Sequence, residues 1–277
     1  MKILNLIKKT INPHGFIKVI DISPRVIPEK YYDNLKCDYA ITEAARVSYS
    51  NGTKKILDDE SLIKYLYSHE HTTPFEMVTF KFHIKAPLFV VRQWQRHRCS
   101  TYNEISGRYS ILPDSFWYPE VFRKQCNINK QGSVSVINNL ELKQEYLKHT
   151  NESHKLYMKY LSMDVSREMA RTILPLNIYT EFYWKIDLHN LLRFIRLRSD
   201  LHAQEEIRLY SNELKEIVKE YCPVTMEAFE NFTLNSMKFS KEELLVLKTK
   251  SEPNKIIKSK SGIIEFNEKI KKLMDYS

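Results

Sequence analysis

The chain has 277 residues, which is long enough for one large domain or two small ones and for a substantial core. It carries 43 Lys and Arg residues against 34 acids, and the formal net charge of +9 favours polyanionic partners, either nucleic acid or phosphorylated nucleotides and cofactors. Widely spaced cysteines argue against a zinc knuckle or a disulfide scaffold, and short apolar runs argue against a signal peptide or a membrane span, so we expect a cytoplasmic protein without a membrane partner.

The first 76 residues predict a strand with its partner, followed by two helices. Residues 16–22 form the strand, and residues 3–7 are expected to pair with it through a turn. A short helix is predicted over 38–47, and another begins at 58–60, where consecutive acids suit a helix N-terminus. Two histidines follow that helix, but no third ligand lies near them, so we expect no metal site.

The clearest strand pattern covers residues 77–85, where apolar and polar side chains alternate. It runs into Pro87, whose fixed φ suits a helix start, and this helix places Gln93 and Arg96 on one side. Residues 99–107 show neither helical nor strand periodicity. We therefore predict an ordered loop there, with backbone donors free to bind a ligand.

The rest of the chain is mostly helical in pattern. We predict an irregular segment at 114–135, a helix at 139–162, a second helix from Ser166 to Leu174, a strand at 177–186 and helical structure at 187–211. Residues 237–277 contain two lysine-rich helical patterns, which are typical of a solvated extension that docks on the main body.

Residues 87–110 carry the densest chemistry. Four arginines and a histidine lie there among polar side chains, with Glu104 as the single acid, and so many fork-shaped donors indicate an anion site. A solvated arginine surface is the alternative that composition leaves open. Farther along, Arg198 lies in L-R-x-D-x-H-A-Q, whose Asp, His and Gln could orient it.

Several motifs together resemble those of the flavin-dependent thymidylate synthases. R-H-R at 96–98 is followed by Ser106 after a seven-residue gap, a long signature for which chance matches are rare. Other matching segments follow the same order along the chain, namely ARVS at 45–48, H-x-T-P-F-E at 71–76, KAP and RQW at 85–94, REMAR-x-x-LP-x-N at 167–177, and LR-x-D-x-HAQ at 197–204. The resemblance covers roughly residues 15–230.

The resemblance implies an α/β fold of the α+β type, with a mixed or antiparallel sheet flanked by long helices, assembled as a homotetramer whose sites are shared between subunits. Residues 1–236 would form the catalytic domain and residues 237–277 a helical extension. The implied reaction makes dTMP from dUMP: NADPH reduces tightly bound FAD, methylenetetrahydrofolate donates a methylene to C5, and a hydride from the flavin completes the methyl group. The chain has no G-x-G-x-x-G motif, so we expect cationic side chains to hold the FAD pyrophosphate.

The resemblance also implies roles for individual residues. FAD contacts are implied for Ser48, His71, Thr73, Glu76, Arg96, His97, Arg98, Glu104, Asp187, His189 and Arg193. Contacts with dUMP are implied for Gln93, Arg96, Glu104, Ile105, Ser106, Gly107, Arg108, Arg171 and Arg198. The catalytic role is that of Arg198, whose permanent charge would stabilise charge developing on the pyrimidine ring. Ser106 has been considered as a nucleophile in this family, but no histidine base is evident beside it in sequence, so we expect a hydrogen-bonding role.

Three positions depart from the family pattern. Asp187 and His189 stand where N-x-R is common, and Arg193 stands where Asn or His is usual. An Asp can accept but not donate a hydrogen bond, which changes what this segment offers a flavin. Two alternatives therefore stay open: a family member that has kept the fold but lost activity, and a basic nucleic-acid-binding protein that stacks bases on aromatic residues within 94–109. The family interpretation predicts no nucleic-acid partner.

Overall fold

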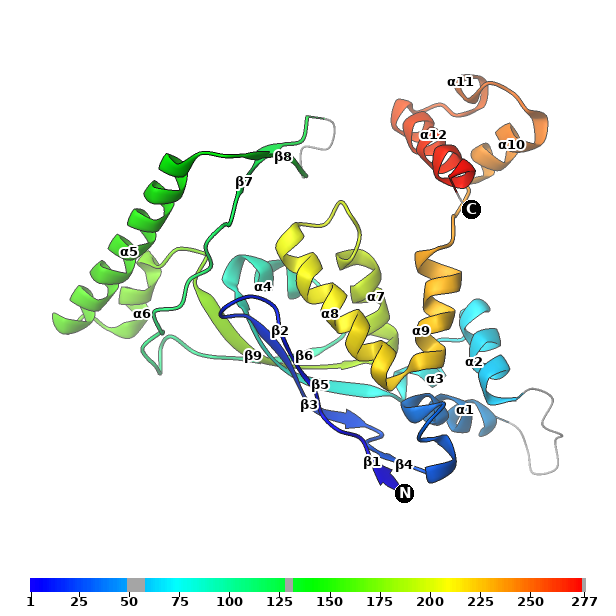
Figure 1. The fold of residues 1–277 in the computed structure, drawn as a ribbon, viewed down its shortest axis with the longest axis horizontal. Coiled ribbons are helices and arrows are strands. Elements are labelled where there is room, and N and C mark those ends of the chain that lie inside the picture. The colour runs from blue at the N-terminus through cyan, green and yellow to red at the C-terminus, as the bar shows by residue number, and fades with distance from the viewer. Residues whose placement is uncertain (49–57, 128–131, 276–277) are drawn as a thin grey trace. The chain divides into compact units, whose positions relative to one another are not determined.

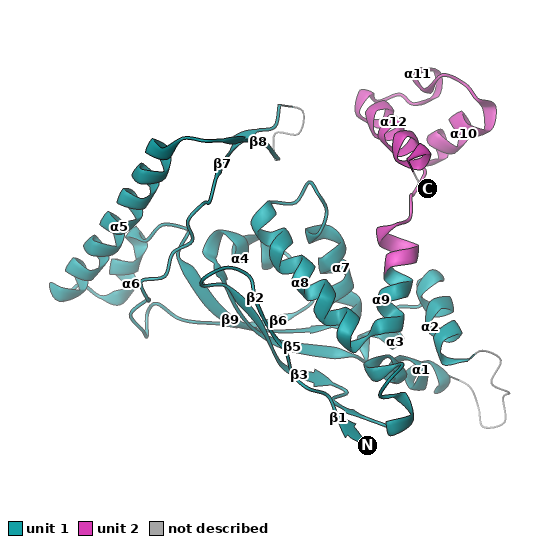
Figure 2. Cartoon of the chain, viewed as in Figure 1, with its two compact units in different colours: residues 1–229 teal, residues 230–277 magenta. Residues whose placement is uncertain are grey.

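The computed structural model describes residues 1–48, 58–127 and 132–275. The chain divides into two compact units, residues 1–229 and residues 230–277, which Figure 2 colours separately. Each unit has a hydrophobic core of its own. All of the residues implied in binding or catalysis belong to the first unit.

A five-stranded antiparallel sheet lies at the centre of the first unit, with strand order β2-β3-β5-β9-β6 (Figure 1). Its strands are β2 (Lys8–Thr10), β3 (Phe16–Ser23), β5 (Thr79–Pro87), β6 (Thr101–Glu104) and β9 (Tyr179–Asp187). Each neighbouring pair is antiparallel. Together with the helices around it, this sheet confirms the expected α+β class.

Alternating side chains explain why β5 and β9 occupy the inner positions of the sheet. In β5, Phe80, Phe82 and Ile84 are fully buried, and the residues between them lie on the more open face. The register places Phe82 opposite Trp184 of β9, so the apolar faces of the two strands coincide. Each of these strands leads directly into a helix that carries arginines of the arginine-rich motifs.

Three helices cover one face of the sheet (Figure 1): α4 (Leu88–Trp94), α7 (Leu188–Arg198) and α8 (Glu205–Tyr221). Their inner sides meet the sheet in an aromatic core, where the ring centroid of Trp94 lies 4.8 Å from that of Phe194, 5.1 Å from Trp184 and 5.7 Å from Tyr210. The helical structure expected over 187–211 is two helices, because residues 199–204 break it between α7 and α8.

The prediction of a loop over 99–107 is wrong in part, because β6 runs through that segment. β6 is an edge strand that pairs with β9, with Tyr102 opposite Trp184. Its sequence, T-Y-N-E, shows no apolar alternation since backbone hydrogen bonds can hold an edge strand with few buried side chains. Residues 105–110 then form an irregular turn.

The expected pairing of residues 3–7 with β3 is wrong except at its last residue, Ile7, whose carbonyl accepts from the Val19 backbone N–H at 2.9 Å. Ile3 pairs with Val26, in a separate two-stranded ribbon of β1 (Lys2–Ile3) and β4 (Val26–Ile27). The strand that pairs with β3 on the outer side of the sheet is β2, which begins one residue beyond the predicted segment. The short apolar run at the N-terminus indicated a strand but not which strand would pair with it.

Four short helices pack together near one end of the sheet: α1 (Tyr39–Arg46), α2 (Asp59–Ser68), α3 (Thr73–Glu76) and α9 (Pro223–Phe229). A buried carboxylate joins the first of them to the last. Asp38 accepts hydrogen bonds from the backbone N–H of Val224 at 2.7 Å, the backbone N–H of Thr225 at 3.2 Å and the Thr225 hydroxyl at 2.5 Å. These bonds satisfy donors at the N-terminus of α9 that the helix itself leaves free.

A hairpin precedes the long helix α5 (Leu140–Ser162), which confirms the helix predicted over 139–162 and has Asn139 as its N-cap. The hairpin strands, β7 (Phe122–Gln125) and β8 (Ser133–Ile137), lie in the segment predicted to be irregular, whose mostly exposed side chains leave no burial pattern to read. After α5, the second predicted helix is present as two pieces, α6 (Arg167–Ala170) and a 3-10 turn, η3 (Arg171–Ile173).

The second unit contains a π-helical turn (Glu230–Leu234), α10 (Lys241–Thr249), α11 (Pro253–Ile256) and α12 (Lys260–Met274). Its core is small and consists of Val246, Ile257 and Phe266. Within the three described stretches of the chain, none of the helices is both long enough and apolar enough to cross a membrane.

Candidate active site

The R-H-R motif lies in the turn that leaves the C-terminal end of α4. Arg96 and Arg98 are exposed, and His97 between them is half-buried. No carboxylate in the described parts of the chain pairs with Arg96 or Arg98. Because a guanidinium does not lose its proton, this turn presents permanent positive charge to solvent and to any anion that binds there.

Arg198, at the last residue of α7, points its guanidinium back to this turn. Its Nε–H donates to Nε2 of His97 at 3.0 Å, and its Nη2–H donates to the backbone carbonyl of Gln93 at 3.2 Å. Burial, together with the nearby charges of Arg198 and Arg193, lowers the pKa of His97 to about 4. His97 is therefore neutral at pH 7 and can accept the Arg198 hydrogen bond.

The side chain of Gln93 is held from the other side of the site. Its Nε2 donates to Oε1 of Gln204 at 2.5 Å, at the residue before α8. Asp200, which was expected to help orient Arg198, accepts hydrogen bonds from the backbone N–H and the imidazole of His202 at 2.8 and 2.9 Å. Arg198 is therefore held by His97 and by the Gln93 carbonyl, and Gln204 holds the side chain of the same glutamine.

Glu104 is fixed at both carboxylate oxygens. Thr180 of β9 donates its hydroxyl to Oε1 at 2.7 Å, and Gln95 donates Nε2 to the other oxygen at 3.1 Å. Sequence reasoning missed Thr180 and Gln95. Thr180 could be found only from the β6–β9 pairing, which places Glu104 opposite Phe182, two residues from Thr180.

The turn after β6 brings Ser106, Gly107 and Arg108 to Arg171. A Cβ built on Gly107 would meet Cδ of Arg171 at 3.0 Å, so the stem of that arginine lies against the glycine backbone. Arg108 pairs with Glu168 at 3.1 Å, and Ser106 Oγ accepts from the Arg108 backbone N–H at 3.3 Å. This turn also borders a pocket of about 470 Å³, which is lined by Arg108, Tyr109, Ile111, Leu161, Asp164, Val165, Ser166, Arg167 and Glu168.

Asp187 and Arg193, two of the departures from the family pattern, lie at different places on α7. Asp187 is the N-cap of α7: Oδ1 accepts from the Asn190 backbone N–H at 2.9 Å, and Oδ2 accepts from its side-chain amide at 2.8 Å. An acceptor-only residue suits this position because a helix N-terminus offers donors. Arg193 is exposed on the same helix, near enough to His97 to influence its pKa.

The remaining predicted flavin residues lie on other elements. Ser48 is exposed after α1, His71 is exposed after α2, and Thr73 and Glu76 are on α3, which packs against α7. No hydrogen bond or ion pair of the described residues joins these side chains to the R-H-R turn. The backbone N–H of Ile105 donates to the backbone carbonyl of Glu181 in β9 at 2.9 Å.

Comparison with known proteins identifies the family to which the chain is similar. Residues 32–224 match the family described as thymidylate synthase complementing protein. A flavin-dependent thymidylate synthase of Dictyostelium discoideum is 44% identical over 268 residues, which cover 95% of this chain and 86% of that protein. One from Thermus thermophilus is 50% identical over 231 residues, covering 83% of this chain and 86% of that protein.

Solved structures agree with these matches. The UMP/dUMP methylase PolB from Streptomyces cacaoi, bound with 5-Br UMP, is similar with a TM-score of 0.67 and 26% identity, over 79% of this chain and 95% of that one. The fold, the arginine-rich turn and the length of these matches agree with the motif resemblance, and the chain belongs to the flavin-dependent thymidylate synthase family.

Proposed function

We propose that this protein makes dTMP from dUMP by reductive methylation, with methylenetetrahydrofolate as carbon donor and NADPH-reduced FAD as hydride source. Relatives that are 44% and 50% identical to this chain are named flavin-dependent thymidylate synthases, and a similar structure is a UMP/dUMP methylase bound with 5-Br dUMP. The observation that carries the proposal is the guanidinium of Arg198, which a neutral His97 and the Gln93 carbonyl hold in one orientation.

Arg198 acts by electrostatics in this proposal. A fixed cation facing the uracil ring stabilises the negative charge that develops as the ring loses its N3 proton, and it polarises the ring at C5. Arginine suits this role because it keeps its charge throughout and does not compete as a proton donor. The two hydrogen bonds that fix Arg198 are already formed without substrate, so the guanidinium does not have to be reoriented when the reaction begins.

The dUMP phosphate is the second ligand group that the site must hold. Arg171, Arg108 and the backbone of Gly107 are the donors that we assign to it and to the ribose, with Ser106 hydrogen-bonding and Glu104 orienting. Ile105 is assigned to dUMP by contact alone, because its backbone N–H already donates to the Glu181 carbonyl. Arg96 and the side-chain amide of Gln93 complete this set. Arg171 has no carboxylate partner among the described residues, so its charge is available to a phosphate.

The donor set also fits the pyrophosphate of FAD. Arg96 and Arg98 have no acidic partner among the described residues. We assign them to the cofactor with His97, Glu104, Ser48, His71, Thr73, Glu76, Asp187, His189 and Arg193. Both carboxylate oxygens of Asp187 accept hydrogen bonds from Asn190 at the start of α7, so we assign Asp187 the role of positioning that helix at the cofactor site. When bound, the flavin supplies the hydride that completes the methyl group.

Assembly and location complete the proposal. We assign residues 1–236 to the catalytic domain and residues 237–277 to an extension, and we propose a homotetramer that shares its sites between subunits. The four cysteines are free thiols, as is usual in a reducing compartment, which supports a cytoplasmic location. The nucleotide chemistry of the arginine-rich turn supports free dUMP as the partner, with no nucleic acid.

The experiment that tests this function is product formation with omissions. Purified protein is expected to show the visible absorbance of a flavin and to convert dUMP to dTMP only when NADPH and methylenetetrahydrofolate are both present. Chromatography of the nucleotides identifies the product. A protein that takes up no added FAD, or that makes no dTMP in the complete mixture, contradicts the proposal.

A further inference from the structure

Side chains from two distant elements reach the carbonyls at the C-terminal end of α4, where the R-H-R turn begins. Arg198 of α7 donates to the carbonyl of Gln93 at 3.2 Å, and the hydroxyl of Tyr102 in β6 donates to the carbonyl of Trp94 at 3.3 Å. The last carbonyls of a helix carry its partial negative charge, so donors and cations stabilise this end. The end of α4 is therefore held from both α7 and β6.

The shorter contact of Tyr102 is with His97. Its hydroxyl donates to the His97 backbone carbonyl at 2.9 Å, and the imidazole of the same histidine accepts from Arg198 at 3.0 Å. Burial raises the pKa of Tyr102, so the hydroxyl keeps its proton and remains a donor at neutral pH. His97 is thus held at its backbone by β6 and at its ring by Arg198.

Strand β6 contacts the same segment through a second side chain. Glu104 lies two residues after Tyr102, on the same side of the strand, and accepts from Gln95 at 3.1 Å. The ring of Tyr102 packs on the core of the sheet, with its centroid 6.1 Å from that of Phe182 and 6.3 Å from that of Trp184. Tyr102→Phe would keep these ring contacts, so the hydroxyl can be tested separately from the packing.

Ser100 also donates its hydroxyl to the His97 carbonyl, at 2.9 Å. Because Ser100 belongs to the turn itself, this bond satisfies the carbonyl but does not tie the turn to the sheet. Tyr102 provides such a tie, since its backbone lies in β6 and pairs with β9 opposite Trp184. Tyr102 therefore connects the central sheet to the residue that orients Arg198.

We propose that Tyr102 is a positioning residue for the reaction, and that its hydroxyl holds the His97 backbone where the imidazole can accept from Arg198. In this role Tyr102 touches neither substrate nor cofactor and acts through His97. A preorganised charge loses part of its effect on the transition state when its orientation is no longer fixed. The hydrogen bonds stand on the structure, whereas the effect on turnover rests on the proposed function.

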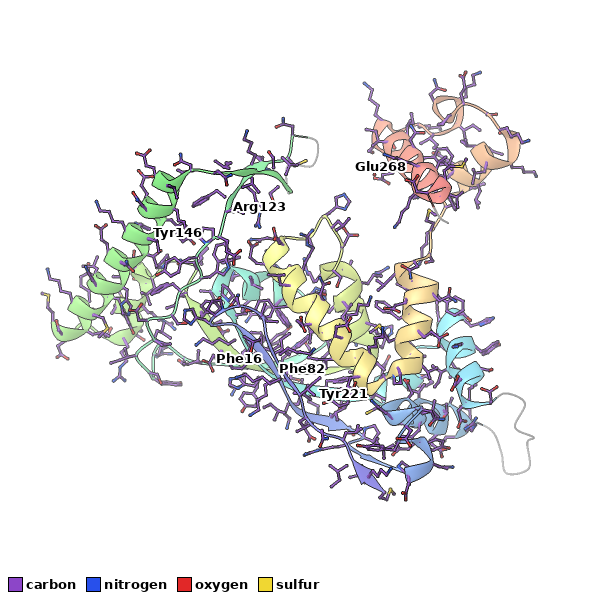
Figure 3. All side chains as sticks on the ribbon, in the orientation of Figure 1. Phe16, Phe82, Arg123, Tyr146, Tyr221 and Glu268 are labelled. Carbon is purple, nitrogen blue, oxygen red and sulfur yellow. The ribbon has the colours of Figure 1, made fainter. Side chains whose placement is uncertain are left out.

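The test compares two variants that each lose one tyrosine hydroxyl bound to a backbone carbonyl. Tyr102→Phe removes the bond to His97. Tyr221→Phe is the matched control, because the Tyr221 hydroxyl donates to the carbonyl of Asn5 at 2.6 Å. Tyr221 is labelled in Figure 3 at the C-terminal end of α8. It lies roughly 24 Å along that helix from Glu205, whose end of α8 is next to the site.

Two quantities are measured on the flavin-loaded full chain: kcat for dTMP formation and the dissociation constant of dUMP by calorimetry. For Tyr102→Phe we expect kcat to fall about threefold to tenfold, which is the rate equivalent of one hydrogen bond. The dUMP dissociation constant should change less than about twofold, because Arg198 acts on charge that develops during the reaction. Tyr221→Phe should keep the wild-type kcat.

A double-mutant cycle with Arg198→Ala separates positioning from a general structural effect. Once the guanidinium is absent, adding Tyr102→Phe should lower the residual rate by less than about 1.5-fold, because the group that it positions is gone. Wild-type kcat in Tyr102→Phe, an equal fall in both backgrounds, or an equal fall in Tyr221→Phe overturns this inference while leaving the proposed function in place. Absence of dTMP formation by the wild type overturns both.

Discussion

The Nε–H of Arg198 donates to Nε2 of His97 at 3.0 Å, although 101 positions separate the two residues in the chain. The contact requires a neutral imidazole with its proton on the other nitrogen, and burial provides that state by lowering the pKa of His97 to about 4. Protonation would remove the acceptor and place two cations against each other. The charge state of His97 and the orientation of Arg198 are therefore coupled.

The stability of the protein should depend on pH through His97. In the unfolded chain the imidazole has its ordinary pKa of 6.5. Between about pH 6.5 and pH 4 the unfolded state therefore binds a proton at His97, whereas the folded state does not. The stabilising contribution is present above pH 6.5 and is lost as the pH falls toward 4. Urea unfolding between pH 4.5 and 7 measures the slope, and His97→Gln, which cannot titrate, should show a shallower one. Equal slopes in both proteins would contradict this assignment.

Thr180 should matter for dUMP binding through Glu104. Thr180→Val removes the hydroxyl that donates to Glu104 at 2.7 Å and leaves a similar volume in the sheet. A hydrogen bond to a charged group contributes about 1.5–3 kcal/mol, so we expect dUMP to bind at least about tenfold more weakly. Titration with dUMP measures the effect. Thr180→Ser keeps the hydroxyl and should bind as the wild type does; a loss as large as that of the valine variant would point to packing as the cause.

Asp187 should contribute to stability as a helix cap. Asp187→Ala removes the acceptors at the N-terminus of α7 and should cost about 1 kcal/mol, whereas Asp187→Asn keeps Oδ1 and should cost less than about 0.5 kcal/mol. Denaturant unfolding measures both variants. If Asn at this position is as destabilising as Ala, capping does not explain the acid.

Asp38 should be a larger source of stability, because it is fully buried and accepts three hydrogen bonds from Val224 and Thr225. Asp38→Ala leaves those donors unsatisfied inside the protein, and we expect a loss of about 2–4 kcal/mol in the free energy of unfolding. Thr225→Val removes one donor and should cost only about 1 kcal/mol. Thermal and urea unfolding test the ranking. Two losses of equal size would show that the carboxylate satisfies no backbone donors.

The core of the fold could be predicted because its signal is local. Phe80, Phe82 and Ile84 alternate with polar neighbours, and this pattern alone indicates β5 and the face that it buries. β6 could not be predicted in this way, since its register comes from β9, more than seventy residues later. The same limit hid the β7–β8 hairpin, whose exposed side chains follow no burial pattern.

In the candidate site, too, local motifs could be predicted from sequence and long-range contacts could not. The motif around R-H-R could be recognised from sequence, but the partners of its members come from distant segments. Thr180 reaches Glu104 only once β6 and β9 pair, and Arg171 meets Gly107 only after α5 has turned the chain back. The sequence marks Asp187 as a departure from the family pattern, but only the structure shows that its carboxylate caps α7.

The most direct measurement of the central claim is the rate of dTMP formation by Arg198→Ala, made on protein whose flavin content and fold match those of the wild type. Loss of one preorganised charge at the reacting ring predicts a fall of about 10²–10³-fold in kcat, and Arg198→Lys should recover only part of it because an ammonium cannot make both contacts to His97 and Gln93. Wild-type turnover by Arg198→Ala would contradict the account.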